Sequence, residues 1–186
     1  MRFLYGKFYN TRYKKIGELI PSEVSVLDIC CGDCKLYENE LKKRVKYIGI
    51  DINHRFLKTA AKKGIDVQKL DIRYQNLPRS DYLILQASLY QFIPNHKKIV
   101  DKMIKAAGNK VIISEPVANV SSSRFSLIAY LAKYSTNPGT GHTPKRFTSK
   151  TFKEFIKNNY SELLEECFLH SGGKELMVVL NTKDKD

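Results

Sequence analysis

The stretch VLDICCGDC, which spans Val26 to Cys34, decides the fold of this chain. An apolar run carries Asp28 to its end, a tight turn around Gly32 follows, and helix-forming residues come next. A buried parallel strand that ends in such a turn lets backbone amides at the start of the following helix approach a ligand closely. The order of residues therefore predicts a strand, turn and helix unit suited to a nucleotide-shaped cofactor.

The chain length predicts one domain over residues 1–186, because 186 residues can bury a substantial core but are too few for two full domains. Hydrophobic residues make up 42% of the chain, and no apolar run approaches the roughly 20 residues that a membrane span requires. The first residues also lack the apolar core of a signal peptide. We therefore expect a cytoplasmic location.

The formal net charge is +13, from 32 Lys and Arg against 19 Asp and Glu. A charge of this size attracts polyanions at long range. The basic residues are nevertheless spread along the chain, as at 14–15, 62–63 and 97–98, which is typical of solvated helix faces. The charge leaves a nucleic-acid partner open but does not favour it.

Three of the four cysteines lie between Cys30 and Cys34, and Cys31 and Cys34 have the C-x-x-C spacing of a redox pair. A cytoplasmic chain does not use cysteines as a disulfide framework. A structural zinc site needs four ligands, and only Cys167 and scattered histidines remain to supply them. We expect no metal site, and a redox pair stays open as an alternative.

Short apolar runs alternate with helix-compatible segments along the chain. The predicted strands end near Asp28, Asp51, Asp71, Gln86 and Glu115. The predicted helices span residues 36–43, 53–63, 95–107 and 149–158. This alternation predicts an α/β fold, a doubly wound Rossmann-like sheet that is mostly parallel and has helices on both faces. A Gly172-Gly173 turn joins the apolar runs 163–169 and 176–180, which predicts an antiparallel hairpin.

The alternation breaks beyond Pro116. Residues 121–134 predict an extra helix, and a loop rich in Gly, Pro and Thr follows over 135–143. Because ligands bind at the carboxyl ends of the strands in open α/β sheets, we expect the excursion 117–148 to cover the cleft. Thr148 or Ser149 is the predicted N-cap of the last helix.

Three carboxylates at successive strand ends are the strongest functional signal. Asp28, Asp51 and Asp71 are 23 and 20 residues apart. One acid after one strand is usually a helix cap. Three in succession line the same rim of the sheet, which predicts a ligand site there.

Residues 24–115 resemble the class I S-adenosylmethionine-dependent methyltransferases. The stretch from Asp28 to Cys34 resembles motif I of that family, an acid followed by alternating glycines, although Cys30 and Cys34 replace the first and third glycines. If these cysteines need positive φ, the strain is about 1–3 kcal/mol. The terminal hairpin resembles the family's antiparallel sixth and seventh strands. The resemblance implies the strand order 3-2-1-4-5-7-6, methyltransferase activity and S-adenosyl-L-methionine as the cofactor.

The resemblance also implies roles for individual residues. Asp51 matches the acid that accepts hydrogen bonds from both ribose hydroxyls, which suits a carboxylate. Asp71 and the Ile72 amide match the segment that recognises adenine, whereas Asp28 and Gln86 match positions that contact the methionine moiety. The implied cofactor-binding residues are Asp28, Cys30, Gly32, Asp51, Ile52, Asp71, Ile72, Gln86 and Tyr9.

A nicotinamide dehydrogenase is the main competitor on this fold, because it too uses an acid about 20 residues beyond a glycine turn. Its turn needs glycines so that the pyrophosphate can approach the backbone. Residues 30–34 supply one glycine, and Asp33 would repel a pyrophosphate. Asp71 and the hairpin also favour the methyltransferase.

The methyl acceptor is harder to infer, since displacement at a sulfonium needs orientation and exclusion of water more than a fixed catalytic residue. Residues 86–90 lack the Asn/Asp-Pro-Pro-aromatic motif of enzymes that methylate base amines, and the chain has no Pro-Cys dipeptide of the cytosine-methylating enzymes. What remains resembles the enzymes that modify small molecules, lipid-like acceptors included. A non-catalytic cofactor- or RNA-binding module on the same fold is the alternative.

Two residues are candidates for catalysis. His142 lies on the excursion and could act as a general base near neutral pH, although solvated loop histidines are more common. Tyr90 follows the fourth strand and either takes part in the reaction or only shapes the cleft. Residues 1–20 are expected to form a helix over the cofactor, where Tyr9 either faces the sulfonium or anchors the helix.

Overall fold

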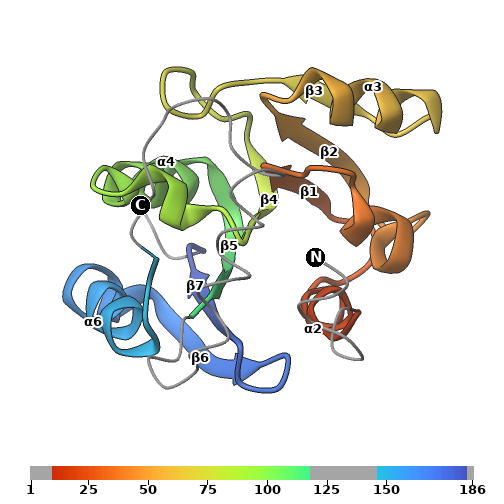
Figure 1. The fold of residues 1–186 in the computed structure, drawn as a ribbon. Coiled ribbons are helices and arrows are strands. Elements are labelled where there is room, and N and C mark those ends of the chain that lie inside the picture. Colours follow the sequence, from red (N-terminus) through yellow and green to blue (C-terminus); the bar gives the residue numbers. More distant parts are fainter. Residues whose placement is uncertain (1–9, 118–145, 184–186) are drawn as a thin grey trace, which may run out of the picture.

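The computed structural model describes residues 10–117 and 146–183. Its seven-stranded sheet has the order β3-β2-β1-β4-β5-β7-β6 (Figure 1), which confirms the predicted doubly wound fold and strand order. β1 to β5 pair with one another in parallel. β7 pairs antiparallel with β5, and β6 pairs antiparallel with β7. The strands are β1 (Ser25–Ile29), β2 (Lys46–Asp51), β3 (Val67–Lys69), β4 (Ser80–Gln86), β5 (Ala107–Pro116), β6 (Leu164–His170) and β7 (Glu175–Asn181).

Helices pack on both faces of this sheet. The helices are α2 (Thr11–Glu18), α3 (His54–Lys62), α4 (His96–Ala106) and α6 (Ser149–Tyr160), with the short turns η2 (Tyr37–Leu41), η3 (Leu89–Phe92) and η4 (Ser161–Leu163). One apolar core joins α4, α6 and η3 to the sheet, and a second joins α2, η2 and α3 to the opposite face. In Figure 1, α4 and α6 accordingly lie to the left of the sheet and α2 to its right.

The central strands are apolar on both sides because helices cover both faces. In β4, Leu83, Ile84 and Leu85 are fully buried, and their side chains alternate between the two cores. This explains why a continuous apolar run, rather than an alternating one, marked the strand in the sequence.

Two local predictions were wrong. The segment predicted as an ordinary helix over 36–43 contains the π-helical turn η2, which the Lys42 amide closes on the Tyr37 carbonyl at 2.9 Å. The helix predicted over 95–107 ends one residue earlier, at Ala106, because Ala107 already pairs with Ser80 of β4. Both outcomes depend on tertiary pairing that a local pattern does not contain.

The last helix begins as predicted. The Thr148 hydroxyl accepts a hydrogen bond from the Thr151 amide, and the Thr151 hydroxyl accepts one from the Thr148 amide, so the two residues form a capping box. The predicted helix 121–134, the loop 135–143, Tyr9 and His142 lie outside the described residues. No helix among residues 10–117 and 146–183 is long and apolar enough to cross a membrane.

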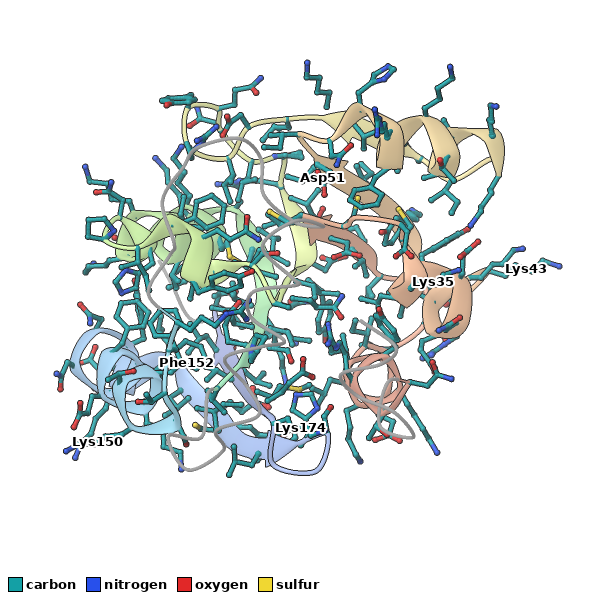
Figure 2. The ribbon with its side chains drawn as sticks, viewed as in Figure 1. Lys35, Lys43, Asp51, Lys150, Phe152 and Lys174 are labelled. Carbon is teal, nitrogen blue, oxygen red and sulfur yellow. The ribbon has the colours of Figure 1, made fainter. Side chains whose placement is uncertain are left out.

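Phe152 anchors α6 on the sheet and is fully buried (Figure 2). We expect Phe152→Ala to lower the free energy of unfolding by about 3–5 kcal/mol, because it removes a buried ring and leaves a cavity. Phe56→Ala is the matched control, since Phe56 is 42% exposed and its loss should change stability by less than about 0.5 kcal/mol. Urea denaturation of both variants measures the difference, and equal losses would contradict this packing.

Candidate cofactor and acceptor site

The predicted site residues lie along one rim of the sheet. Asp28 is the penultimate residue of β1, Asp51 is the last residue of β2, and Gln86 is the last of β4. Asp71 lies two residues beyond the end of β3. The parallel strands place all four at the carboxyl ends, where ligands bind in open α/β sheets.

The turn after β1 has the backbone of a glycine-rich loop without its glycines. Cys30, Gly32 and Cys34 all have positive φ, at 56°, 54° and 56°. The cysteines therefore occupy positions that favour glycine, at a cost on the order of 1–3 kcal/mol each. A Cβ added at Gly32 would meet nothing within 4 Å among the described atoms, so the space above this residue is open to a ligand.

Asp51 ties this turn to the end of β2 (Figure 2). Its Oδ2 accepts a hydrogen bond from the Gly32 amide at 3.0 Å, and its Oδ1 accepts one from the Asn53 amide at 2.8 Å. The side chain is partly exposed, and the neighbouring Ile52 is 43% exposed. The carboxylate is thus fixed beside the turn, with an apolar surface next to it.

Asp28 is almost completely buried, and burial raises the pKa of its carboxyl to about 7. The nearby charge of Asp51 raises the pKa further, while a hydrogen bond from the Tyr47 hydroxyl to Oδ2, at 2.9 Å, opposes the shift. Among the described residues, neither Asp28 Oδ1 nor Gln86 Oε1 has a hydrogen-bond partner. Two buried acceptors at adjacent strand ends fit the ammonium group of a methionine moiety, which is a donor only.

The Asp71 carboxylate has a partner that sequence reasoning missed. The Arg73 guanidinium binds both of its oxygens, with Nε to Oδ1 at 2.9 Å and Nη2 to Oδ2 at 2.6 Å, and this contact lowers the pKa of Asp71. Lys102 of α4 fixes the same loop by donating to the Ile72 carbonyl at 2.8 Å. An adenine amine that binds Asp71 would therefore either share the carboxylate with the Arg73 guanidinium or displace the guanidinium from it.

Glu115 is a fourth strand-end acid, and the analysis of the sequence gave it no role. It is fully buried at the end of β5, and its Oε1 accepts hydrogen bonds from the amides of Ser88 and Leu89 at 2.7 and 2.6 Å. Burial raises its pKa to about 7, although these amides oppose the shift. Glu115 therefore holds the start of η3, which follows Gln86. The signal was present, because Glu115 follows an apolar run exactly as the other acids do.

Tyr90 lies in η3 beside this acid. Its ring is buried, and the Arg146 guanidinium lies over it at 4.5 Å from the centroid. Burial raises the pKa of its hydroxyl, so Tyr90 is protonated at neutral pH. The structure places Tyr90 just beyond the end of β4, with its ring buried and packed against Arg146. Its catalytic role stays a prediction.

Buried polar residues from α2, β5, β6, β7 and the turn between β6 and β7 continue the rim beyond Glu115. Arg12 of α2 forms an ion pair with Glu175 at the start of β7, with Nη2 and Oε1 2.8 Å apart. The Ser171 hydroxyl donates to Glu175 Oε2 at 3.1 Å and contacts His170 Nδ1 at 3.0 Å, and His170 Nε2 contacts the Ser114 hydroxyl at 3.0 Å.

This arrangement fixes the state of the histidine. Since the Ser171 hydroxyl donates to Glu175, its oxygen accepts from Nδ1, and Nε2 accepts from Ser114. Burial lowers the pKa of His170 to about 4, and the Arg12 charge contributes, so the ring is neutral at pH 7. Sequence reasoning missed this network, because nothing local indicates that residues 12, 114, 170 and 175 meet.

A polar hollow of about 1090 Å³ lies at the opposite rim, where Ser80, Asp81 and Ala107 line it. These residues begin β4 and β5. The hollow is therefore at the amino ends of the strands and is separate from the predicted cofactor residues.

Comparisons with known proteins agree with this fold. A Planctomyces limnophilus O-methyltransferase family 2 protein, solved in complex with apigenin, superposes with a TM-score of 0.67 at 14% identity over 97% of this chain. This chain spans 60% of the length of that protein. A Thermotoga maritima methyltransferase described as a possible histamine N-methyltransferase gives a TM-score of 0.68 at 13% identity, covering 98% of this chain and 93% of its own.

A third match is the magnesium protoporphyrin IX methyltransferase of Synechocystis with bound S-adenosylhomocysteine. Its TM-score is 0.66 at 12% identity, and the match covers 94% of this chain and 82% of the other. No curated protein matches the chain by sequence.

The sheet order and the turn after β1 are those of the class I S-adenosylmethionine-dependent methyltransferases. Within that class, the chain belongs to the family of the methionine biosynthesis protein MetW, whose family model matches residues 10–167.

The raised pKa of Asp28 predicts a pH-dependent cost to stability. The folded protein keeps this proton up to about pH 7, whereas the unfolded chain releases it near its usual value of 3.8. Raising the pH from 4 to 7 therefore removes stability through this group. The Asp28→Asn variant carries an amide that does not ionise. The melting temperature of this variant, measured relative to that of the wild type, should therefore increase by several degrees as the pH rises.

Differential scanning fluorimetry of the ligand-free protein between pH 5 and 8 measures this difference. Asp33→Asn is the control, because Asp33 is exposed. A difference between Asp28→Asn and wild type that does not change with pH would contradict the assignment.

Proposed function

We propose that the protein transfers the methyl group of S-adenosylmethionine to a small-molecule acceptor. The observation that carries this proposal is the hydrogen bond between the Gly32 amide and Asp51 Oδ2, at 3.0 Å. It fixes a carboxylate beside an open positive-φ turn, and this is the arrangement that a ribose with two adjacent hydroxyls requires.

The cofactor fits the rim along its length. Asp51 would accept the ribose hydroxyls, exposed Ile52 would pack on the adenine, and Asp71 with the Ile72 amide would bind the adenine edge. Asp28 and Gln86 would accept hydrogen bonds from the methionine ammonium group through the two buried oxygens that lack partners among the described residues. Cys30 and Gly32 would shape the turn, and Tyr9 would complete the site from outside the described residues.

When bound, S-adenosylmethionine supplies a methyl group on a positively charged sulfur, which is a good leaving group because it departs as a neutral thioether. The protein then has to orient the acceptor, exclude water and accept a proton where the acceptor loses one. Glu115 acts indirectly by holding η3, and with it Tyr90, beside the end of β4. His142 is the proposed proton acceptor.

The acceptor would bind at the end of the cleft toward β5 and β7. The excursion 117–148 and the segment 1–20 would cover it there, and both would belong to one domain over residues 1–186. Two observations support a small molecule. The neighbouring structures include a protein in complex with apigenin and a magnesium protoporphyrin IX methyltransferase. Residues 86–90 also lack the motif of the base-amine methyltransferases. The cytoplasmic location inferred from the sequence remains part of this proposal.

Isothermal calorimetry with S-adenosylhomocysteine tests the cofactor assignment. We expect the wild type to bind it, and Asp51→Ala to bind at least about tenfold more weakly, because hydrogen bonds to a charged group are lost. Asp66→Ala is the control, since Asp66 is an exposed acid just before β3 and should leave the affinity unchanged.

NADH serves as the competing ligand in the same experiment. If the protein bound NADH and not S-adenosylhomocysteine, the site would be that of a nicotinamide dehydrogenase, and the methyltransferase proposal would be wrong. Equal affinities of the wild type and Asp51→Ala for S-adenosylhomocysteine would remove the ribose role of Asp51.

A further inference from the structure

Cys31 and Cys34 close the turn on which the proposed cofactor site depends. The Cys34 amide donates to the Cys31 carbonyl at 3.0 Å. A turn closed in this way holds its first and fourth Cα atoms within about 7 Å, and a disulfide needs about 4.4–6.8 Å between them. The backbone is therefore already arranged for a bond between the two sulfurs.

The two thiols also lie close enough for each to shift the pKa of the other. Cys31 Sγ lies over Gly49 of β2, where an added Cβ would come within 2.9 Å of that sulfur and 3.1 Å of the Tyr47 hydroxyl. Gly49 thus provides the space that the Cys31 thiol and the tyrosine occupy. Cys34 is fully buried and Cys31 is 9% exposed, so access is restricted to small molecules.

The environments of the two thiols differ. The hydrogen bond from Cys31 lowers the pKa of Cys34, and a hydrogen bond from Tyr47 adds to this effect. The same contact and burial raise the pKa of Cys31. Cys34 is therefore the more acidic thiol of the pair and the one that would react first, and Cys31 is the resolving partner.

We propose that Cys31 and Cys34 form a reversible disulfide beneath the cofactor turn, with a hydroperoxide as the oxidant, and that this bond weakens cofactor binding. The disulfide itself stands on the geometry of the turn. Its effect on affinity rests on the function proposed above.

The chemistry balances with hydrogen peroxide as the oxidant. The Cys34 thiolate attacks one peroxide oxygen, so that an S–O bond forms, the O–O bond breaks, and the departing hydroxide takes up a proton as water. The Cys31 thiol then loses its proton and its sulfur attacks Cys34, so that the S–S bond forms and the S–O bond breaks, releasing a second water. The two thiols lose two electrons in total, and the peroxide gains them.

The disulfide would act on the turn between the two cysteines. Gly32 lies inside the closed ring and donates to Asp51. Drawing the sulfurs to about 2.05 Å changes the path of the backbone on either side of this amide and separates the thiols from Tyr47. Because the Gly32 amide positions the Asp51 carboxylate, we expect displacement of this amide to weaken the affinity for S-adenosylhomocysteine by about tenfold, the equivalent of one hydrogen bond to a charged group.

The experiment compares the protein before and after treatment with hydrogen peroxide by intact mass and by alkylation of the denatured chain. The reduced chain has four cysteines to alkylate. After oxidation we expect a loss of the mass of two hydrogens and two fewer alkylated cysteines, both restored by dithiothreitol. Cys31→Ser and Cys34→Ser should abolish the loss. Cys167→Ser should retain it, since Cys167 lies on the edge strand β6.

The wild-type mass decides the proposal even if a serine variant fails to fold. Oxidation to sulfinic acid without loss of two hydrogens would overturn the disulfide, as would a loss that persists in Cys34→Ser. Calorimetry with S-adenosylhomocysteine then compares the two redox forms, and equal affinities would overturn the effect on binding. Failure of the reduced form to bind would count against the proposed function and leave the disulfide standing.

Discussion

The hydrogen bond between the Gly32 amide and Asp51 is the contact on which the rest of the site depends. It joins the end of β1 to the end of β2 across a turn in which three residues have positive φ. It acts together with the Cys31 amide, which donates to the Ile50 carbonyl at 3.1 Å, to hold the strained path of a turn that has only one glycine. The positions of Asp28 and Gln86 are set by the register of the parallel strands β1, β2, β4 and β5.

The sequence predicted the sheet well because the physical signal was local. Apolar runs that end in acids specify buried parallel strands, and the strand order and hairpin were confirmed. Side-chain partners were predicted poorly. That Arg73 would fold back on Asp71, or that Tyr47 would donate to Asp28, depends on rotamers and strand register rather than on composition. The π-helical turn η2 was missed for a related reason, since it reflects how α2 packs on it at Gly17, where a Cβ would lie 2.8 Å from Glu40 Cβ.

Burial of charge differs between the two ends of the rim. At the cofactor end, Asp28 is a buried acid with a raised pKa and an oxygen that lacks a partner among the described residues. Toward β7, Glu115 and Glu175 are buried but are held by amides, by Arg12 and by Ser171. Such paired buried charges fix geometry more than they add stability. The rim therefore combines a rigid part, which positions η3 and α2, with a part whose acceptors are left for a ligand.

The ion pair between Arg12 and Glu175 also has a consequence for biogenesis. Arg12 comes long before Glu175 in the sequence, so α2 is made well before its partner leaves the ribosome. Until β7 emerges, the buried face of α2 lacks the carboxylate that neutralises its arginine, and the antiparallel hairpin cannot yet pair with β5. Long-range pairings of this kind form late, because closing them orders much of the chain between. Nascent chains would therefore carry the turn after β1 well before the polar network around Glu175 exists.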